Sequence, residues 1–96
     1  MKIVVVATRS TKHTAEEFAP LLAPEAKMAM KLWAGDFIRE LYARKDGKGA
    51  VLVCEAVSEE EARQKLGQLP LVQKGMLTME FYPVGPYRAI VQLAEG

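Results

Sequence analysis

Hydrophobic and polar positions divide this chain into four strand-like segments separated by polar or helical stretches. Residues 3–7 (IVVVA) form an unbroken, mostly β-branched run, which is typical of a central strand covered on both faces. Residues 37–44 (FIRELYAR) and 50–56 (AVLVCEA) are predicted as the second and third strands, and residues 77–84 alternate as the fourth. The turn at 45–49 (KDGKG) makes a hairpin of the middle pair, because Asp-Gly and a second glycine tolerate positive φ.

A first helical region follows the polar loop after residue 8. Thr14 and Glu17 have the spacing of a capping box, so a short helix is expected to start there. Pro20 and Pro24 are expected to interrupt it, since proline lacks the backbone N–H that a helix interior needs. Pro24 suits the first turn of a new helix, which would run to about residue 34 with a glycine as its C-terminal cap.

The second helix has the clearest local signal in the chain. The hydroxyl of Ser58 can accept a hydrogen bond from the N–H of Glu61, and the Glu61 carboxylate can reach back to the N–H of Ser58. Pro70 is expected to end this helix near Leu69. Residues 88–93 are apolar enough to pack on something, which the pattern leaves open as a fifth strand or a contact with a partner subunit.

The order βαββαβ with a central hairpin predicts a single α+β domain over residues 1–96 with the ferredoxin-like plait. In this fold two helices cover one face of a four-stranded antiparallel sheet. Side-chain alternation makes one face apolar and gives the other a mixture of charged, aromatic and aliphatic groups. That mixture predicts that two sheets pack face to face across a two-fold axis, as a homodimer and with larger assemblies left open.

The chain resembles the dimeric α/β-barrel superfamily, and within it most closely the muconolactone isomerase family. The resemblance rests mainly on residues 66–71 (LGQLPL), where a helix ends in L-x-x-L-P-L before the last strand. Residues 35–39 (GDFIR), 49–51 (GAV) and 83–87 (PVGPY) add support. The resemblance implies homodimers that share a barrel, with a small-molecule pocket in each protomer between the sheet and the helices, or at the dimer mouth. It also implies an isomerase that shifts a double bond in a small lactone carboxylate by proton transfer, without metal or cofactor. The proline-rich segment before the first helix and the scarcity of histidine depart from that family.

Such an isomerase needs a base whose pKa lies near neutrality and a cation for the substrate carboxylate. Glu40 and Glu80 are strand carboxylates whose pKa would rise if they were buried beside tyrosines, and His13 is the only histidine. These three are the predicted catalytic residues. The predicted substrate-binding residues are two cations and three aromatic side chains: Arg39, Arg44, Tyr42, Tyr82 and Trp33. Cross-strand salt pairs for the charged residues, a surface loop position for His13 and a core position for Trp33 are the structural alternatives.

Composition argues against some classes of function but does not single out one. A net charge of +1 with no basic stripe argues against a nucleic-acid partner, and no apolar run is long enough to cross a membrane. The single cysteine, Cys54, suits a reducing compartment and a buried, inert position, and a cytoplasmic location is the expectation. The sequence shows no ligand spacing for a metal and no glycine-rich phosphate loop.

Three functions stay open at this point. The first is a cofactor-independent isomerase of a small, unsaturated, anionic lactone or related metabolite. The second is a non-catalytic homodimer that binds a small molecule or acts as an interaction module. The third is a cofactor-free oxygenase on the same fold. The sequence does not decide whether the protein is an enzyme.

Overall fold

The computed structural model describes residues 1–96. Its elements, in chain order, are β1 (Lys2–Arg9), α1 (Ala15–Ala34), β2 (Ile38–Ala43), β3 (Gly49–Glu55), α2 (Glu59–Leu66), α3 (Pro70–Gln73), β4 (Leu77–Val84) and α4 (Arg88–Glu95). The four strands lie where the hydrophobic pattern predicts them, to within two residues at every strand end, and both predicted helical regions are present.

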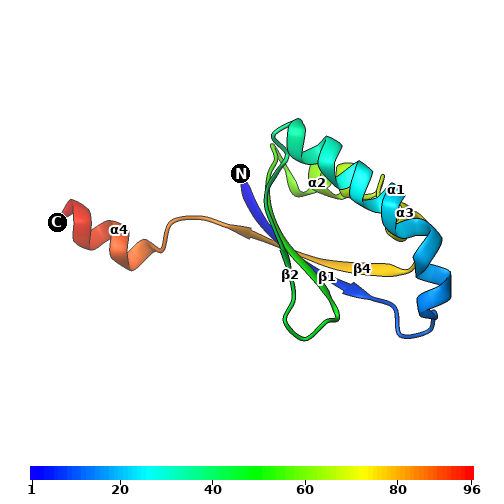
Figure 1. Cartoon of the computed structure of the whole chain (residues 1–96). Helices are drawn as coiled ribbons and strands as arrows, with labels where there is room; N and C mark the ends of the chain where they lie inside the picture. Colours follow the sequence, from blue (N-terminus) through cyan, green and yellow to red (C-terminus); the bar gives the residue numbers. More distant parts are fainter.

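The strands form one antiparallel sheet with the order β2-β3-β1-β4. Helices α1, α2 and α3 all lie against one face of this sheet, and its other face is open (Figure 1). β1 is therefore a central strand, as its β-branched run predicts. The arrangement confirms the α+β ferredoxin-like plait.

A β-bulge near the start of β2 sets which side chains face the helices. Ile38 pairs with Cys54, but the next paired residue is Glu40, which lies opposite Val53, so Arg39 is the extra residue. The bulge allows both Ile38 and Leu41 to face the helices. Glu40 and Tyr42 consequently lie on the open face.

The core lies between the sheet and the three helices. Ile3, Val5 and Cys54 are fully buried on the sheet side, and Ala62 and Leu66 are fully buried on α2. Burying a side chain of the size of leucine contributes roughly 1.5–3 kcal/mol. The core is therefore one-sided, and the opposite face of the sheet is uncovered in the single chain.

Helix α1 is continuous across both prolines, so the expected break at Pro20 and Pro24 is wrong. Both prolines are exposed, and the carbonyls deprived of a partner can bond to water. Packing of the apolar face of α1 on the sheet outweighs the local cost, which is how most protein helices are stabilised. The capping box is present as predicted: the N–H of Thr14 donates to Glu17 Oε1 at 2.9 Å, and the N–H of Glu17 donates to Thr14 Oγ1 at 3.2 Å.

The second helical region differs from the prediction in two details. Ser58 Oγ accepts from the N–H of Glu61 at 3.1 Å, but the Glu61 carboxylate accepts from the N–H of Val57 and not from that of Ser58. Helix α2 ends at Leu66, and Pro70 is the first residue of the short helix α3. Proline is favoured there because its missing N–H has no partner in a first turn.

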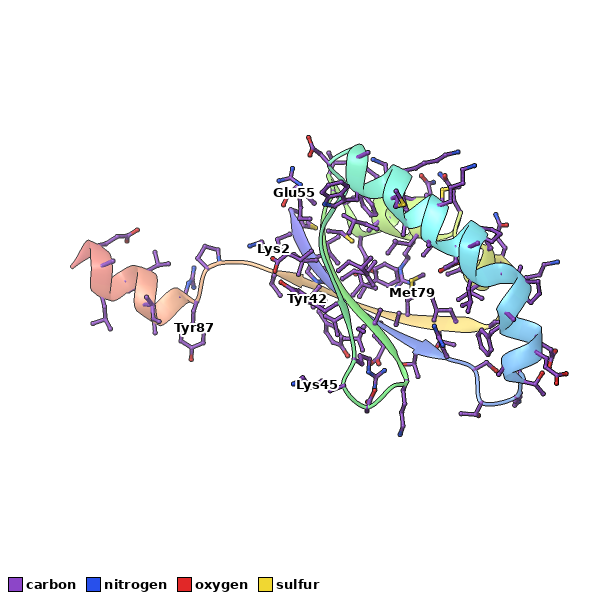
Figure 2. All side chains as sticks on the ribbon, in the orientation of Figure 1. Lys2, Tyr42, Lys45, Glu55, Met79 and Tyr87 are labelled. Carbon is purple, nitrogen blue, oxygen red and sulfur yellow. The ribbon has the colours of Figure 1, made fainter.

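Residues 88–95 form the helix α4, not a fifth strand, and this helix lies away from the rest of the chain (Figure 1). Residues 85–87 connect it to β4 as an extended arm, and Tyr87 on this arm points away from the body (Figure 2). None of the helices combines the length and the apolar character that crossing a membrane requires.

Candidate functional site

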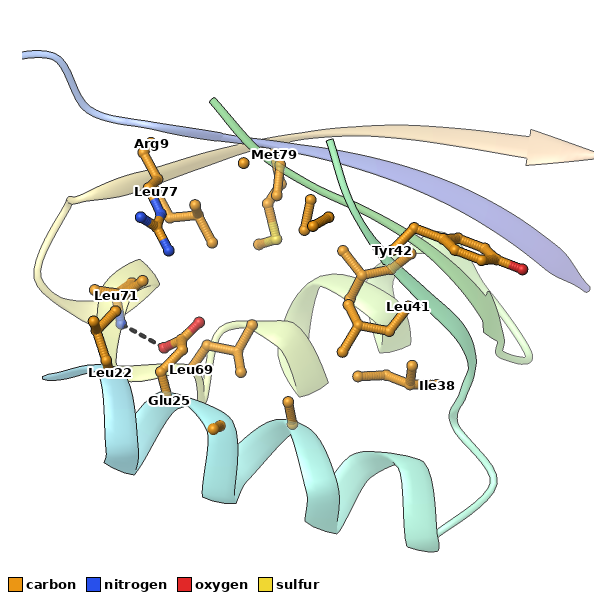
Figure 3. A pocket seen from close by; sticks show the side chains of 17 residues that line it. Arg9, Leu22, Glu25, Ile38, Leu41, Tyr42, Leu69, Leu71, Leu77 and Met79 are labelled. Atoms are coloured by element: carbon orange, nitrogen blue, oxygen red, sulfur yellow. Dashed lines mark hydrogen bonds between the residues drawn. The ribbon is translucent and has the colours of Figure 1, made fainter. Parts of the chain in front are cut away.

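An apolar cavity of about 340 Å³ lies between α1 and the sheet (Figure 3). Fourteen of its 17 lining residues are hydrophobic. They come from α1, from all four strands and from the turn around α3. A cavity of this size and character accommodates a small organic molecule, and its few polar groups determine what that molecule can be.

Glu25 is the carboxylate that lines the cavity. It projects from the middle of α1 and is half-buried, and its Oε1 accepts a hydrogen bond from the N–H of Leu71 at 2.9 Å (Figure 3). Burial raises the pKa of Glu25 above its ordinary value, and the Leu71 N–H and the Arg9 charge oppose that rise. A carboxyl group with a raised pKa in an apolar cavity is suited to proton transfer near neutral pH.

The chain around residues 66–71 creates the hydrogen bond that holds Glu25. Leu66, Leu69 and Leu71 are buried, which pins the turn between α2 and α3 against the core. Pro70 then starts α3, so the N–H of Leu71 falls in the first turn, where a helix supplies no partner of its own. The L-x-x-L-P-L segment therefore positions a backbone donor opposite α1.

Arg9 supplies the positive charge at the same end of the cavity. It is the last residue of β1, and its guanidinium lies 5.5 Å from the centre of the Phe18 ring. The side chains of Arg9 and Glu25 point toward one another in Figure 3, but no salt bridge joins them. The Arg9 guanidinium is consequently free to pair with a bound anion.

Tyr42 lines the cavity with its stem only. Its ring points away from Glu25 (Figure 3), and its hydroxyl donates to Glu40 Oε1 at 2.5 Å. This hydrogen bond to a carboxylate raises the pKa of the Tyr42 phenol. The cavity thus contains one carboxyl group, Glu25, and one cation, the exposed Arg9.

The structure does not bring the three predicted catalytic residues together. Glu40 and Glu80 lie on the edge strands β2 and β4, on the open face, where each accepts a hydrogen bond from the tyrosine two residues later. His13 lies in the loop after β1, where its Nδ1 is 2.8 Å from Ser10 Oγ and its ring meets Phe18 edge-on. None of the three lines the cavity, and their catalytic role stays a prediction.

The predicted binding residues are also dispersed. Arg44 donates to Thr8 Oγ1 at 2.8 Å and to Asp46 Oδ2 at 2.6 Å, which ties the β2–β3 hairpin to β1. Arg39 donates from Nε to the carbonyl of Asp36 at 2.7 Å, at the bulge.

The two remaining aromatic candidates lie on the surface. Tyr82 donates to Glu80 Oε2 at 2.7 Å on the open face. Trp33 is 64% exposed, so the core position considered for it is wrong. It lines a second hollow, between α1 and β2.

Sequence reasoning missed Glu25 and Arg9, although Glu25 carried a signal. Leu22, Glu25 and Ala29 are spaced i, i+3 and i+7 on α1, which is the spacing of a buried helical stripe. A carboxylate within such a stripe indicates either a buried partner or a functional group. Reading the prolines as a helix break concealed this stripe. No group of three or more His, Cys, Asp and Glu side chains is placed to hold a metal ion.

Comparison with known proteins supports the fold. No protein-family model matches the sequence, and no curated protein matches it. Among solved structures, the chain is similar to 5-chloro-2-hydroxyhydroquinone dehydrochlorinase (TftG) from Burkholderia phenoliruptrix AC1100, in complex with 2,5-dihydroxybenzoquinone. The TM-score is 0.72 at 15% identity, over 93% of this chain and 98% of the other. Similarity at this identity shows the fold alone, which is the fold expected of the dimeric α/β-barrel superfamily; membership of the muconolactone isomerase family stays a prediction.

Proposed function

We propose that this protein is an isomerase that moves a proton within a small, unsaturated, anionic ring compound such as a lactone carboxylate. The observation that carries the proposal is a half-buried Glu25 with a raised pKa facing Arg9 across an apolar cavity. The complex of the similar dehydrochlorinase with 2,5-dihydroxybenzoquinone supports a small unsaturated ring as the ligand class.

The proposed reaction needs only a base and a fixed positive charge. The Glu25 carboxylate takes a proton from the carbon next to a carbonyl group, and the C–H electron pair becomes part of a conjugated enolate. Protonated Glu25 then returns the proton to the far carbon of that system, so the double bond has moved and no net charge or electron is gained. A positioned base contributes roughly 10²–10⁴-fold to such a step.

Arg9 is proposed to bind the anionic group and to stabilise the enolate. Its guanidinium can bind a carboxylate through two parallel hydrogen bonds. Apolar side chains line most of the cavity, which limits solvent screening of this attraction on the inner side of Arg9. Phe18, whose ring lies beneath the guanidinium, keeps Arg9 at the mouth of the cavity.

Deuterium exchange tests the proposal without knowledge of the natural substrate. A panel of five- and six-membered unsaturated lactone carboxylates is incubated with the protein in D2O, and NMR follows both exchange and double-bond migration. We expect Glu25→Gln to lower kcat by about 10²–10⁴-fold. We expect Arg9→Met mainly to raise KM, because it removes the cation that binds the substrate.

The matched control is Glu16→Gln, which changes an exposed carboxylate in the first turn of the same helix. It should retain the wild-type rate. A Glu25→Gln variant that exchanges its substrate at the wild-type rate would refute the role of Glu25 as the base.

A second candidate is a homodimer that binds a small molecule without converting it. The absence of a second acid–base group from the cavity favours it, since the Tyr42 hydroxyl is occupied by Glu40. Calorimetric binding of panel compounds by wild type, weakened by Arg9→Met and accompanied by no exchange, would establish this alternative.

We also propose that the open face of the sheet is the dimer interface. Its centre is an apolar square of four valines, Val4 and Val6 on β1 and Val51 and Val53 on β3. A Glu–Tyr pair borders the square on each edge strand. Across the sheet one row reads Glu40, Val53, Val4, Tyr82 and the next reads Tyr42, Val51, Val6, Glu80.

These rows are self-complementary. Suppose that a two-fold axis runs parallel to the strands, midway between two such faces. Each row of one sheet then lies opposite the same row of the other sheet, read in the reverse order. Glu40 then faces Tyr82 of a second copy, and Tyr42 faces Glu80. Carboxylates meet phenol groups and valines meet valines, as an isologous interface requires.

Val6→Lys tests the interface, because it places a charge in the centre of the square. Light scattering should give twice the chain mass for wild type and the chain mass for this variant at micromolar concentration. Lys27→Met, which removes a charge from the exposed side of α1, is the matched surface control and should stay dimeric. A monomeric wild type would rule out the interface.

A further inference from the structure

The cavity between α1 and the sheet has its charged side chains at one end only. The three lining residues that are not hydrophobic are Arg9, Glu25 and Gly49, and glycine has no side chain to offer. Arg9 and Glu25 lie together at one end in Figure 3, whereas Ile38 and Leu41 lie at the other. A ligand whose anionic group pairs with Arg9 therefore meets apolar side chains further along the cavity, where a second polar group would lose its water without gaining a partner.

The cavity is also larger than a single ring requires. A cavity of about 150 Å³ is sufficient to hold benzene, and this one has a volume of about 340 Å³. Arg9 is exposed, so an anionic group that pairs with it lies at the mouth and occupies little of the interior. A six-membered ring beside Glu25 would thus leave roughly half of the volume unfilled. Apolar walls that touch nothing contribute neither burial nor dispersion to binding.

One row of the sheet gives the cavity this additional space. Ala50 pairs with Ala7 on one side and with Ala43 on the other, so three alanines lie next to one another across β1, β3 and β2. All three line the cavity. The next row toward the far end has larger side chains, since Leu41 pairs with Leu52. The alanine row therefore leaves a hollow that ends at two leucines.

The side chains of α1 that face this hollow are small as well. Ala26 and Ala29 are the α1 residues that line the cavity beyond Glu25. Ala29 follows Glu25 by four positions, which corresponds to about 6 Å along a helix. An unbranched chain of four carbons extends about 5–6 Å from a ring, because carbon–carbon bonds are about 1.5 Å long and zigzag. The apolar part of the cavity therefore has the length of such a chain.

We infer that the substrate carries an apolar substituent of about four carbons, which lies between the alanine row of the sheet and α1 while the anionic group pairs with Arg9. The alanines are then specificity-determining residues, because larger side chains in their place would exclude the substituent. Contacts with this remote part of the substrate help to position the ring beside Glu25. The inference rests on the proposed function, since it assigns a class of substrate to the same cavity.

Calorimetric titration with para-alkylbenzoates tests the substituent separately from the chemistry, because these compounds bind without reacting. Benzoate supplies a ring and an anionic group, and para-ethyl and para-butyl groups extend it. A fully buried methylene group corresponds to about fourfold in Kd. Leu22 and Leu41 on the walls are 43% and 51% exposed, so water reaches part of the cavity. We therefore expect about twofold to fourfold per carbon, and para-butylbenzoate should bind at least about tenfold more tightly than benzoate.

Two substitutions fill the space that is assigned to the substituent. Ala50→Leu acts from the sheet and Ala26→Leu acts from α1, and each should lower the tenfold preference for para-butylbenzoate to about threefold or less. Ala26 is exposed and lies within a helix, where leucine is well tolerated, so this variant gives a result even if Ala50→Leu does not fold. The matched control is Ala34→Leu, an exposed position of α1 outside the cavity, which should keep the wild-type preference.

Equal affinities of wild type for benzoate and para-butylbenzoate would overturn the inference, and so would an unchanged preference in Ala26→Leu. The deuterium-exchange assay separates these failures from a failure of the proposed function. If Glu25→Gln stops exchange but the butyl group adds no affinity, the substituent alone is refuted. If the butyl preference depends on Ala26 but Glu25→Gln exchanges like wild type, the isomerase is refuted and the shape of the ligand stands.

Discussion

Glu25 is predicted to lower the stability of the fold at neutral pH, and Glu25→Gln measures the effect. Burial raises the pKa of this carboxyl group in the folded chain above the ordinary value of 4.5. Such a group does not lower the free energy of unfolding at a pH below its pKa in the unfolded chain. Its destabilising effect grows as the pH rises toward its pKa in the folded chain. Glutamine stays uncharged, and its amide oxygen can still accept from the N–H of Leu71. Wild type should therefore lose stability relative to Glu25→Gln as the pH rises above about 4.5, and the loss should level off above the pKa of folded Glu25.

The differences in the free energy of unfolding between wild type and the Glu25 variants have two separate contributions. An NMR titration measures how far the pKa of Glu25 is raised in the folded protein, and each pKa unit lowers the stability of wild type at high pH by about 1.4 kcal/mol. Because water reaches part of the carboxylate, we expect this contribution to be small. Glu25→Ala removes the acceptor of the Leu71 N–H, and a desolvated donor without a partner costs about 1–3 kcal/mol. Glu25→Ala should thus be less stable than Glu25→Gln at every pH.

Urea unfolding followed by circular dichroism, at fixed protein concentration and at several pH values, gives the three stability curves. For a domain of this length, 1 kcal/mol corresponds to roughly 4–8 °C in Tm, so the differences are measurable. The decisive comparison is the slope of wild type against Glu25→Gln. Parallel slopes across the pH range would show an unperturbed carboxyl group and would remove the reason for choosing Glu25 as the base.

Two further predictions concern the framework of the site. A Cβ at Gly49 would lie 2.0 Å from the carbonyl oxygen of Ala7, so Gly49→Ala should force β1 and β3 apart and lower the free energy of unfolding by about 3 kcal/mol or more. Gly75→Ala, at φ +69° in open space, should cost only about 1–2 kcal/mol, and equal urea midpoints for the two variants would contradict this reasoning. Burial raises the pKa of the Cys54 thiol to about 11, so a thiol reagent at neutral pH should label it about a hundredfold more slowly in native than in unfolded protein. Immediate labelling of native protein would show that the β1–β3 core opens readily.

Most of the fold could be predicted from the sequence, because its elements carry strong local signals. The valine run of β1, the alternation of β4, the Asp-Gly hairpin and the two helix starts each reflect short-range chemistry. The bulge at Arg39 also keeps Glu40 and Tyr42 on the face that side-chain alternation assigns to them. The continuity of α1 cannot be predicted from the sequence in this way, because Pro20 and Pro24 carry a local cost that only packing on the sheet offsets.

The site could be predicted only in part, because it depends on contacts between distant residues. Glu25 gains its raised pKa from burial beneath a turn 46 positions further along the chain, and no local pattern specifies that contact. Glu40 and Glu80 were chosen as strand carboxylates beside tyrosines, and each does bond to a tyrosine, although on the open face. The sequence therefore predicts strand carboxylates beside tyrosines, whereas the carboxylate that lines the cavity lies on α1.

The place of β1 at the centre of the sheet also determines the order in which the protein can assemble during synthesis. β1 leaves the ribosome well before both of its neighbours, β3 and β4, which come from much later in the chain. Until residue 84 has emerged, one side of this valine-rich strand has unpaired backbone groups, which is the state in which strands recruit other chains. Because β1–β4 contacts join residues far apart in sequence, we expect this late closure to slow folding.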